Sequence, residues 1–181
     1  MRYSQLKPRK QVSGFTLIEI IIGIVAFSIA LSIVSQLIAP TEQQSADQIH
    51  QIKAAELGQA LMDEILGRAF DENSDMVGGR DRCGETGQPA CTPEGSFGPD
   101  TGEGNRALFD DVDDYISSDF PLTNSTNTSL HSGYDSFKVS VEVEYDGATL
   151  GLVDELAKRI KITVTTPLGT DIEFSAYKAN F

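Results

Sequence analysis

A single acidic residue, Glu19, interrupts the apolar run Phe15–Ala39. A carboxylate inside a membrane helix costs on the order of a few kcal/mol unless it finds a partner, and acids in such positions commonly have a function. The run is long enough to cross a bilayer as a helix, which takes about 20 apolar residues. Glu19 is therefore the first candidate functional residue, and its chemistry is the pairing of a charge in an apolar environment.

The residues around Glu19 resemble the type IV prepilin signature. The segment SGFTLIE, residues 13–19, follows a basic stretch and opens the apolar run. In that family a dedicated peptidase cuts after the glycine and methylates the new N-terminus. The resemblance implies cleavage between Gly14 and Phe15, N-methylation at Phe15, and a role in assembly for Glu19, the fifth residue after the cut.

The pairing of charges gives this resemblance a physical basis. Cleavage after Gly14 would leave an ammonium group on Phe15, one helical turn from Glu19 and able to reach the Glu19 of a neighbouring subunit. A paired charge in a low dielectric costs far less than a lone one. In pilins this pairing is thought to register an incoming subunit against the previous one, and the resemblance implies the same role here.

The two cysteines, Cys83 and Cys91, lie close together in CGETGQPAC. An even pair in an oxidising compartment is most simply a disulfide, and closing so short a loop stabilises by only a few kcal/mol. A metal site is the rival interpretation, although two cysteines without a nearby histidine do not complete a zinc shell. We expect the disulfide.

A cluster of acids lies in ALFDDVDDYISSDF, residues 107–120, and its carboxylates are Asp110, Asp111, Asp113 and Asp114. Clustered carboxylates are typical ligands of Ca²⁺, which takes six to eight oxygens. Some pseudopilins of type II secretion bind Ca²⁺. The spacing does not match the D-x-D-x-D-G loop, however, and acidic pairs also occur in solvated turns, so both interpretations stay open. No other cofactor is expected.

The composition argues against several other functions. Asp and Glu number 27 against 14 Lys and Arg, which gives a formal charge of −13 at pH 7. So acidic a surface repels phosphate backbones, and we expect no nucleic-acid partner. We find no nucleophile motif, histidine pair or phosphate loop, so the sequence predicts that the protein is not an enzyme.

The leader, residues 1–14, carries four basic residues and no acid. Basic residues before an apolar segment keep that end in the cytoplasm, so the head is expected in the periplasm after a single pass of the inner membrane. A secretory signal has an apolar region of only about 7–15 residues. The sequence therefore predicts a membrane or filament-core helix over 15–40.

The helix is expected to continue over 41–70 as an amphipathic segment. Its apolar residues recur three and four apart, namely Ala46, Ile49, Ile52, Leu57, Leu61, Ile65 and Ala69. Residues 71–181 form the periplasmic head, which begins with a loop region over 71–135, rich in Gly, Pro, Asp, Ser and Asn.

The end of the head, residues 136–181, reads as an antiparallel sheet. Phe137, Val139, Val141, Val143 and Tyr145 alternate with polar residues, and two further runs, 158–166 and 171–178, alternate in the same way. A turn over 167–170 joins the last two runs. The predicted fold is α+β, the type IV pilin fold, in which a long N-terminal helix packs on a sheet of three to four strands.

Two segments of the head also resemble the minor pilins of the mannose-sensitive haemagglutinin (MSHA) pilus: the run F-x-D-V-D-D-Y at 109–115 and the C-terminal segment 175–181. The resemblance implies a minor pilin that acts in pilus assembly, initiation or adhesion at the tip, and that ends in the pilus outside the cell. The implied partners are other major and minor pilins, the prepilin peptidase, an inner-membrane assembly platform, and the membrane before assembly. The alternatives are a pseudopilin of type II secretion and a membrane-tethered periplasmic enzyme or binding protein.

Overall fold

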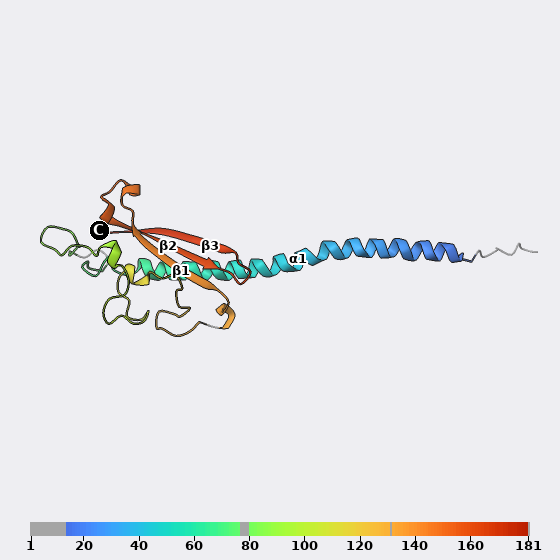
Figure 1. Cartoon of the computed structure of the whole chain (residues 1–181), viewed down its shortest axis with the longest axis horizontal. Coiled ribbons are helices and arrows are strands. Elements are labelled where there is room, and N and C mark those ends of the chain that lie inside the picture. Colours follow the sequence, from blue (N-terminus) through green and yellow to red (C-terminus); the bar gives the residue numbers. More distant parts are fainter. Residues whose placement is uncertain (1–13, 77–79, 131, 181) are drawn as a thin grey trace, which may run out of the picture. The chain divides into compact units, whose positions relative to one another are not determined.

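The computed structural model describes residues 14–76, 80–130 and 132–180, with the side chains of these residues except those of 37–46. The chain forms two compact units, Met1–Ala46 and Asp47–Phe181. Among the described residues, its regular elements are the helix α1 and the strands β1, β2 and β3 (Figure 1), with short 3-10 turns in the connections. The arrangement is α+β, as predicted, and is consistent with the pilin fold.

The helix α1 extends from Leu17 to Leu66. At its start the Glu19 N–H donates to Oγ1 of Thr16 at 3.3 Å, so Thr16 caps an otherwise unpaired backbone donor. At its end the N–H of Gly67 donates to the carbonyls of Asp63 and Glu64. The chain leaves the helix at this glycine, a residue that favours helix ends over helix interiors.

One face of α1 is buried in the second unit. Its buried residues are Ala54, Gly58, Leu61, Met62 and Ile65. Ile49 and Ile52, which the sequence pattern placed on the same stripe, are 57% and 61% exposed, so that part of the prediction was wrong. The reason is geometric, because Ile52 lies two positions before Ala54, which corresponds to about 200° of rotation around a helix of 3.6 residues per turn.

The sheet consists of β1 (Lys138–Tyr145), β2 (Ala157–Thr165) and β3 (Asp171–Ala179). The strands are antiparallel and lie in the order β1-β2-β3. The turn between β2 and β3 is closed by a hydrogen bond from the Gly169 N–H to the Thr166 carbonyl, and Gly169 has a φ of 83° that glycine adopts without strain.

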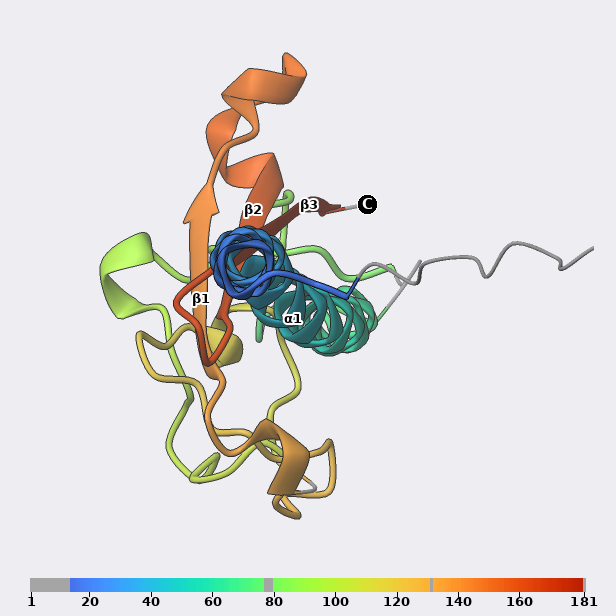
Figure 2. The same cartoon turned by 90° about the vertical axis from the view of Figure 1, so that its right-hand side faces the viewer.

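The predicted alternation along the strands is confirmed. Phe137, Val139, Val141 and Val143 are buried, and so are Ile160, Ile162 and Val164. These residues form one core with the buried face of α1, with Val112, Tyr115 and Phe120 from the preceding loops, and with partly buried residues of β3. Figure 2 shows the three strands together with the end of α1 that belongs to this unit. The sheet therefore buries its apolar face against the helix, as binary patterning requires.

The helix and β3 approach closely at Gly58. A Cβ placed on Gly58 would lie 2.2 Å from a ring carbon of Phe174, far inside van der Waals contact. Phe174 packs partly buried against the core. The lack of a side chain at Gly58 thus makes room for the aromatic ring, which explains a glycine within a helix where it is otherwise unfavourable.

Candidate functional site

The peptide bond between Gly14 and Phe15 lies just before α1. Residues 14–16 are outside regular structure, and α1 begins at Leu17. A Cβ placed on Gly14 would meet open space, and Phe15 is 81% exposed. Exposed segments outside regular structure are the preferred sites of proteolytic cleavage. The geometry of the unit is therefore compatible with cleavage at this bond.

Glu19 lies in the first turn of α1, where the helix dipole favours a negative charge. The segment Leu17–Gln36 that contains it is long and apolar enough to cross a membrane, by length and composition. Its large apolar side chains, among them Ile18, Ile22 and Phe27, are 62%, 62% and 67% exposed. A helix so apolar on all its faces requires lipid or other apolar helices around it.

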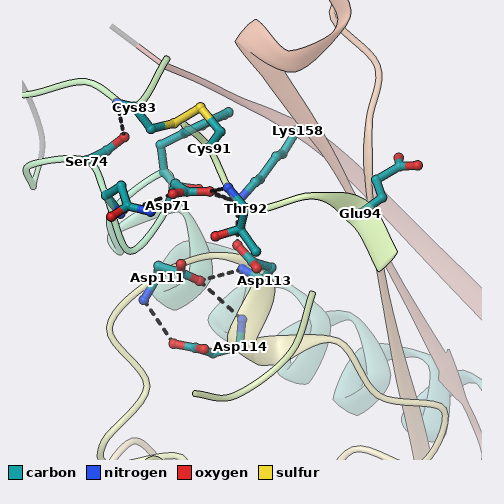
Figure 3. Close-up of polar contacts among 12 residues, drawn as sticks. Asp71, Ser74, Cys83, Cys91, Thr92, Glu94, Asp111, Asp113, Asp114 and Lys158 are labelled. Atoms are coloured by element: carbon teal, nitrogen blue, oxygen red, sulfur yellow. Dashed lines mark hydrogen bonds and ion pairs between the residues drawn. A yellow bond between two sulfur atoms is a disulfide. The ribbon is translucent and has the colours of Figure 1, made fainter. Parts of the chain in front are cut away.

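In the head, β2 brings a fully buried lysine into a set of acids (Figure 3). Nζ of Lys158 donates to the Phe70 carbonyl at 2.7 Å and lies 3.4 Å from Oδ2 of Asp71. It also forms a buried ion pair with Oδ1 of Asp113. Asp71 follows the end of α1 and Asp113 begins the 3-10 turn η2 (Asp113–Tyr115), so the lysine joins the helix, the sheet and a loop.

Aromatic rings surround the same ammonium group. The centroids of Phe70, Phe97 and Tyr145 lie 4.8, 4.7 and 5.7 Å from Nζ of Lys158. Aromatic faces attract a cation while they exclude water from it. The carboxylate of Asp71 has further partners, since it accepts hydrogen bonds from the backbone N–H groups of Asn73 and Thr92.

Burial is the main influence on the pKa values of Asp111 and Asp113. It raises the pKa of Asp111 to about 8, with a further contribution from the charge of Asp113 and an opposing one from Lys158. Burial also raises the pKa of Asp113, again against the effect of Lys158. Lys158 therefore does not fully offset the burial of these two carboxylates, and Asp111 and Asp113 retain their protons at a higher pH than free side chains do.

The acidic cluster of residues 110–114 divides between two environments. Asp111 accepts hydrogen bonds from the N–H groups of Asp113 and Asp114, and Asp114 accepts from those of Asp110 and Asp111. These contacts cap the η2 turn. Asp113 points to Lys158 instead. Asp111, Asp113 and Asp114 thus have protein partners for their side chains, and the Asp110 side chain interacts with Glu72. Calcium binding stays a prediction.

Two of the four carboxylates of residues 110–114, Asp110 and Asp114, converge with Glu103 from the preceding loop. Glu103, Asp110 and Asp114 each place one oxygen within 4.8 Å of the others. Burial, together with the nearby charges of Asp114 and Asp110, raises the pKa of Glu103 to about 7, although its hydrogen bond with the Asp100 backbone has the opposite effect. Among the described residues, this set brings three carboxylate oxygens close enough together for a hard cation such as Ca²⁺ to contact all of them.

Cys83 and Cys91 are joined by a disulfide, with their Cα atoms 4.7 Å apart. Asn180, at the end of the described chain, donates from Nδ2 to the Cys83 carbonyl at 3.0 Å. Ser74 connects the two segments, because its hydroxyl donates to Oδ1 of Asn180 and accepts from the Cys83 N–H. The disulfide loop is thereby fastened to the C-terminal segment that follows β3.

Comparison with known proteins adds one finding, which concerns the N-terminal segment. The model of the prokaryotic N-terminal methylation motif matches residues 9–35. The chain carries a methylation motif of the prepilin type. No curated protein and no solved structure matches the chain.

The methylation motif contains the three residues singled out from the sequence: Gly14, Phe15 and Glu19. It supports a protein of the type IV pilin or pseudopilin kind, which is processed by a prepilin peptidase and assembles with other pilins. The apolar helix of the motif also fits membrane anchoring. Residues 9–13 of the motif lie outside the described residues, and its described part contains the start of α1.

Sequence reasoning missed the buried lysine and its helix-end partner. Lys158 lies two residues before Ile160 on β2, so the alternation that places Ile160, Ile162 and Val164 inside also places Lys158 inside. That parity was a usable signal. Asp71 gave no such signal, because its partner is 87 positions away in the chain and only the fold brings the two together.

Proposed function

We propose that this protein is a minor type IV pilin of the MSHA kind. It inserts into the inner membrane with its basic leader in the cytoplasm and its head in the periplasm. Prepilin peptidase cuts after Gly14 and methylates Phe15, and the mature chain then enters a pilus outside the cell. The observation that carries the proposal is the match of residues 9–35 to the methylation motif, since that motif contains the cleavage site and the apolar helix together.

The exposed apolar surface supports assembly with other pilins. The large apolar side chains of α1 between Leu17 and Val34 are about half exposed or more, and in the second unit Ile49 and Ile52 are exposed as well. Removing such surface from water or lipid contact requires like helices, so the partners are major and minor pilins. The peptidase and an inner-membrane assembly platform act on the chain before it leaves the bilayer.

Glu19 has the role of registering the subunit in the filament. After cleavage, the ammonium of Phe15 and the carboxylate of Glu19 carry opposite charges at the same end of α1. In an apolar filament core the charge of Glu19 costs least when it meets the ammonium of a neighbouring chain. The pairing therefore favours one axial offset between successive helices over the others.

The head has a structural role in this proposal and no catalytic one. Its buried charges serve to join segments of the fold, as Lys158 does with Asp71 and Asp113. A cavity lies beside the disulfide, and two of its carboxylates, Glu94 and Asp154, accept hydrogen bonds from backbone N–H groups. These contacts favour a scaffold over a site that turns over a substrate.

The choice of the MSHA kind rests on the resemblance of residues 109–115 and 175–181 to its minor pilins. A pseudopilin of type II secretion has the same processing motif, so the two differ in the phenotype of a deletion strain. We expect the deletion to reduce piliation or adhesion and to leave enzyme secretion intact. Loss of secreted enzymes with normal pili would assign the protein to type II secretion.

The role of Glu19 gives the direct test of assembly. We expect Glu19→Ala to be processed normally but to accumulate in the membrane, and to be missing from sheared filaments. Ser28→Ala, on the same helix, serves as a matched control because the Ser28 hydroxyl binds only the Ile24 carbonyl of its own helix among its described contacts. Equal amounts of the Glu19→Ala and wild-type chains in filaments would contradict the proposed pairing.

A further inference from the structure

The buried lysine of β2 has the surroundings in which an ion pair can become a covalent bond. We propose that Lys158 and Asp113 form an intramolecular amide bond between Nζ and Cγ. The bond would tie β2 directly to the η2 turn, across 45 positions of sequence. It would be a second covalent cross-link in the head, besides the disulfide between Cys83 and Cys91.

Contact and burial are the first requirements of such a reaction, and both are met. Nζ of Lys158 contacts Oδ1 of Asp113, and the two side chains are 0% and 3% exposed. Holding two reacting groups in a fixed geometry is equivalent to effective concentrations of about 10⁵–10⁸ M. Condensation releases water, so a site closed to solvent also protects the product from hydrolysis.

A base for the reaction is also in place. Oδ2 of Asp71 lies 3.4 Å from Nζ of Lys158, and Asp71 is itself fully buried. Asp71 is anchored by the N–H groups of Asn73 and Thr92, so its carboxylate keeps its position as the lysine reacts. The amine thus has an acid to attack on one side and a proton acceptor on the other.

The chemistry balances without a further reactant. Asp71 takes one proton from the Lys158 ammonium, which frees the nitrogen lone pair to attack Cγ of Asp113. The C–N bond forms, and one oxygen of the Asp113 carboxylate leaves as water with a second nitrogen proton and the proton held by Asp71. The ammonium and the carboxylate become a neutral amide, one water is released, and Asp71 returns to its starting state.

The surroundings favour the neutral product over the ion pair. Burying two opposite charges carries a desolvation cost that their attraction only partly offsets. The rings of Phe70, Phe97 and Tyr145 attract the ammonium, and they can also pack against a neutral amide. A desolvated lysine is also a better nucleophile than one in water.

Mass spectrometry of the denatured full-length chain tests the proposal. We expect a mass lower than that of the linear chain, disulfide included, by one water. Trypsin should fail to cut after Lys158 and should release a branched peptide that joins 107–138 to 139–159. Linear peptides that end at an unmodified Lys158, with the 107–138 peptide at full mass, would overturn the proposal.

Matched variants exclude other sources of water loss, such as cyclisation at Asp146–Gly147. Lys158→Arg keeps the positive charge, and Asp113→Ala removes the acceptor; both should restore the linear mass and remove the branched peptide. Asp71→Asn should lower the cross-linked fraction. A water loss that persists in Lys158→Arg would place the modification elsewhere and contradict the proposal, and the wild-type digest decides the question even if a variant does not fold.

Discussion

Arg106 donates hydrogen bonds to both carboxylate oxygens of Glu64, from Nε at 3.0 Å and from Nη2 at 2.8 Å. Glu64 lies on the last turns of α1, and Arg106 lies in the loop before the η2 turn. The hydroxyl of Tyr115 also donates to Glu64, at 2.9 Å. Burial acts to raise the pKa of Glu64, but these hydrogen bonds outweigh it and lower the pKa below the usual value. The pair therefore fastens the long loop region to the helix.

Removing this contact should destabilise the head. We expect Arg106→Met to lower the free energy of unfolding by about 2 kcal/mol, the usual range for hydrogen bonds to a charged group. Urea unfolding followed by circular dichroism measures the effect. Arg159→Met, which breaks a surface pair with Glu144, is the control and should have a much smaller effect. Equal effects of the two variants would contradict the role assigned to Arg106.

The close approach of Gly58 and Phe174 reverses the effect on stability that is expected for a glycine-to-alanine substitution in a helix. Alanine is favoured over glycine in a helix by about 1 kcal/mol. We nevertheless expect Gly58→Ala to lower stability, by about 1–2 kcal/mol, because the new Cβ would overlap the ring of Phe174. In a Phe174→Ala background the same substitution should stabilise. A stabilising effect in both backgrounds would show that the ring is not the obstacle.

Glu103 should give the head a pH-dependent stability. Its pKa is raised to about 7 in the folded state, so the folded chain holds this proton more tightly than the unfolded chain does. Its contribution is therefore fully present below the unfolded pKa of about 4.5 and is lost as pH rises to about 7. Asp110 and Asp114 add to the rise in this pKa, and the hydrogen bond with the Asp100 backbone opposes it.

Thermal unfolding from pH 5 to pH 8 measures this dependence. We expect the midpoint of the wild type to fall over that range, and we expect a smaller fall for Glu103→Gln, which removes the titrating group. Ca²⁺ added at pH 7.5 should raise the midpoint of the wild type if the convergent carboxylates bind it. Identical pH profiles for the two proteins would contradict the raised pKa.

Substitution of an exposed isoleucine of the head should impair assembly without impairing folding. Ile52 is 61% exposed, so Ile52→Asp should leave the unfolding midpoint nearly unchanged. We expect it to reduce the amount of the protein in sheared filaments several-fold, because a charge would replace an apolar contact. Val153→Asp is a matched control, since Val153 is 64% exposed in the connection between β1 and β2. Equal incorporation of both variants would contradict the contact.

Local patterns in the sequence predict the fold to a large extent. Alternation over 137–145 and 158–166 places the strands and their inward residues, because a half-buried strand has a period of two. Three-and-four spacing predicts the helix, but it does not fix which face is buried, and Ile49 and Ile52 are consequently on the outside. The burial of a helix face depends on where the sheet meets it, which the sequence of the helix does not contain.

The two sites also differ in how far their residues could be predicted from the sequence. Gly14, Phe15 and Glu19 lie close together in the chain, so spacing alone identifies them, and the methylation motif contains all three. Lys158, Asp71 and Asp113 come from β2, the segment after α1 and the η2 turn, and they meet only in the folded head. The acids of residues 110–114 stood out by number, yet their contacts with backbone N–H groups depend on the turn that they cap.

Cleavage after Gly14 is the step on which the proposed role depends. The decisive measurement is the N-terminal sequence and mass of the protein from cells with and without prepilin peptidase, together with Gly14→Ala. We expect a mature chain that starts at methylated Phe15 only where the peptidase is present, and little or no processing of Gly14→Ala. An uncut chain, or one cut after Ala39, would contradict the assignment and would indicate an ordinary anchor or secretory signal.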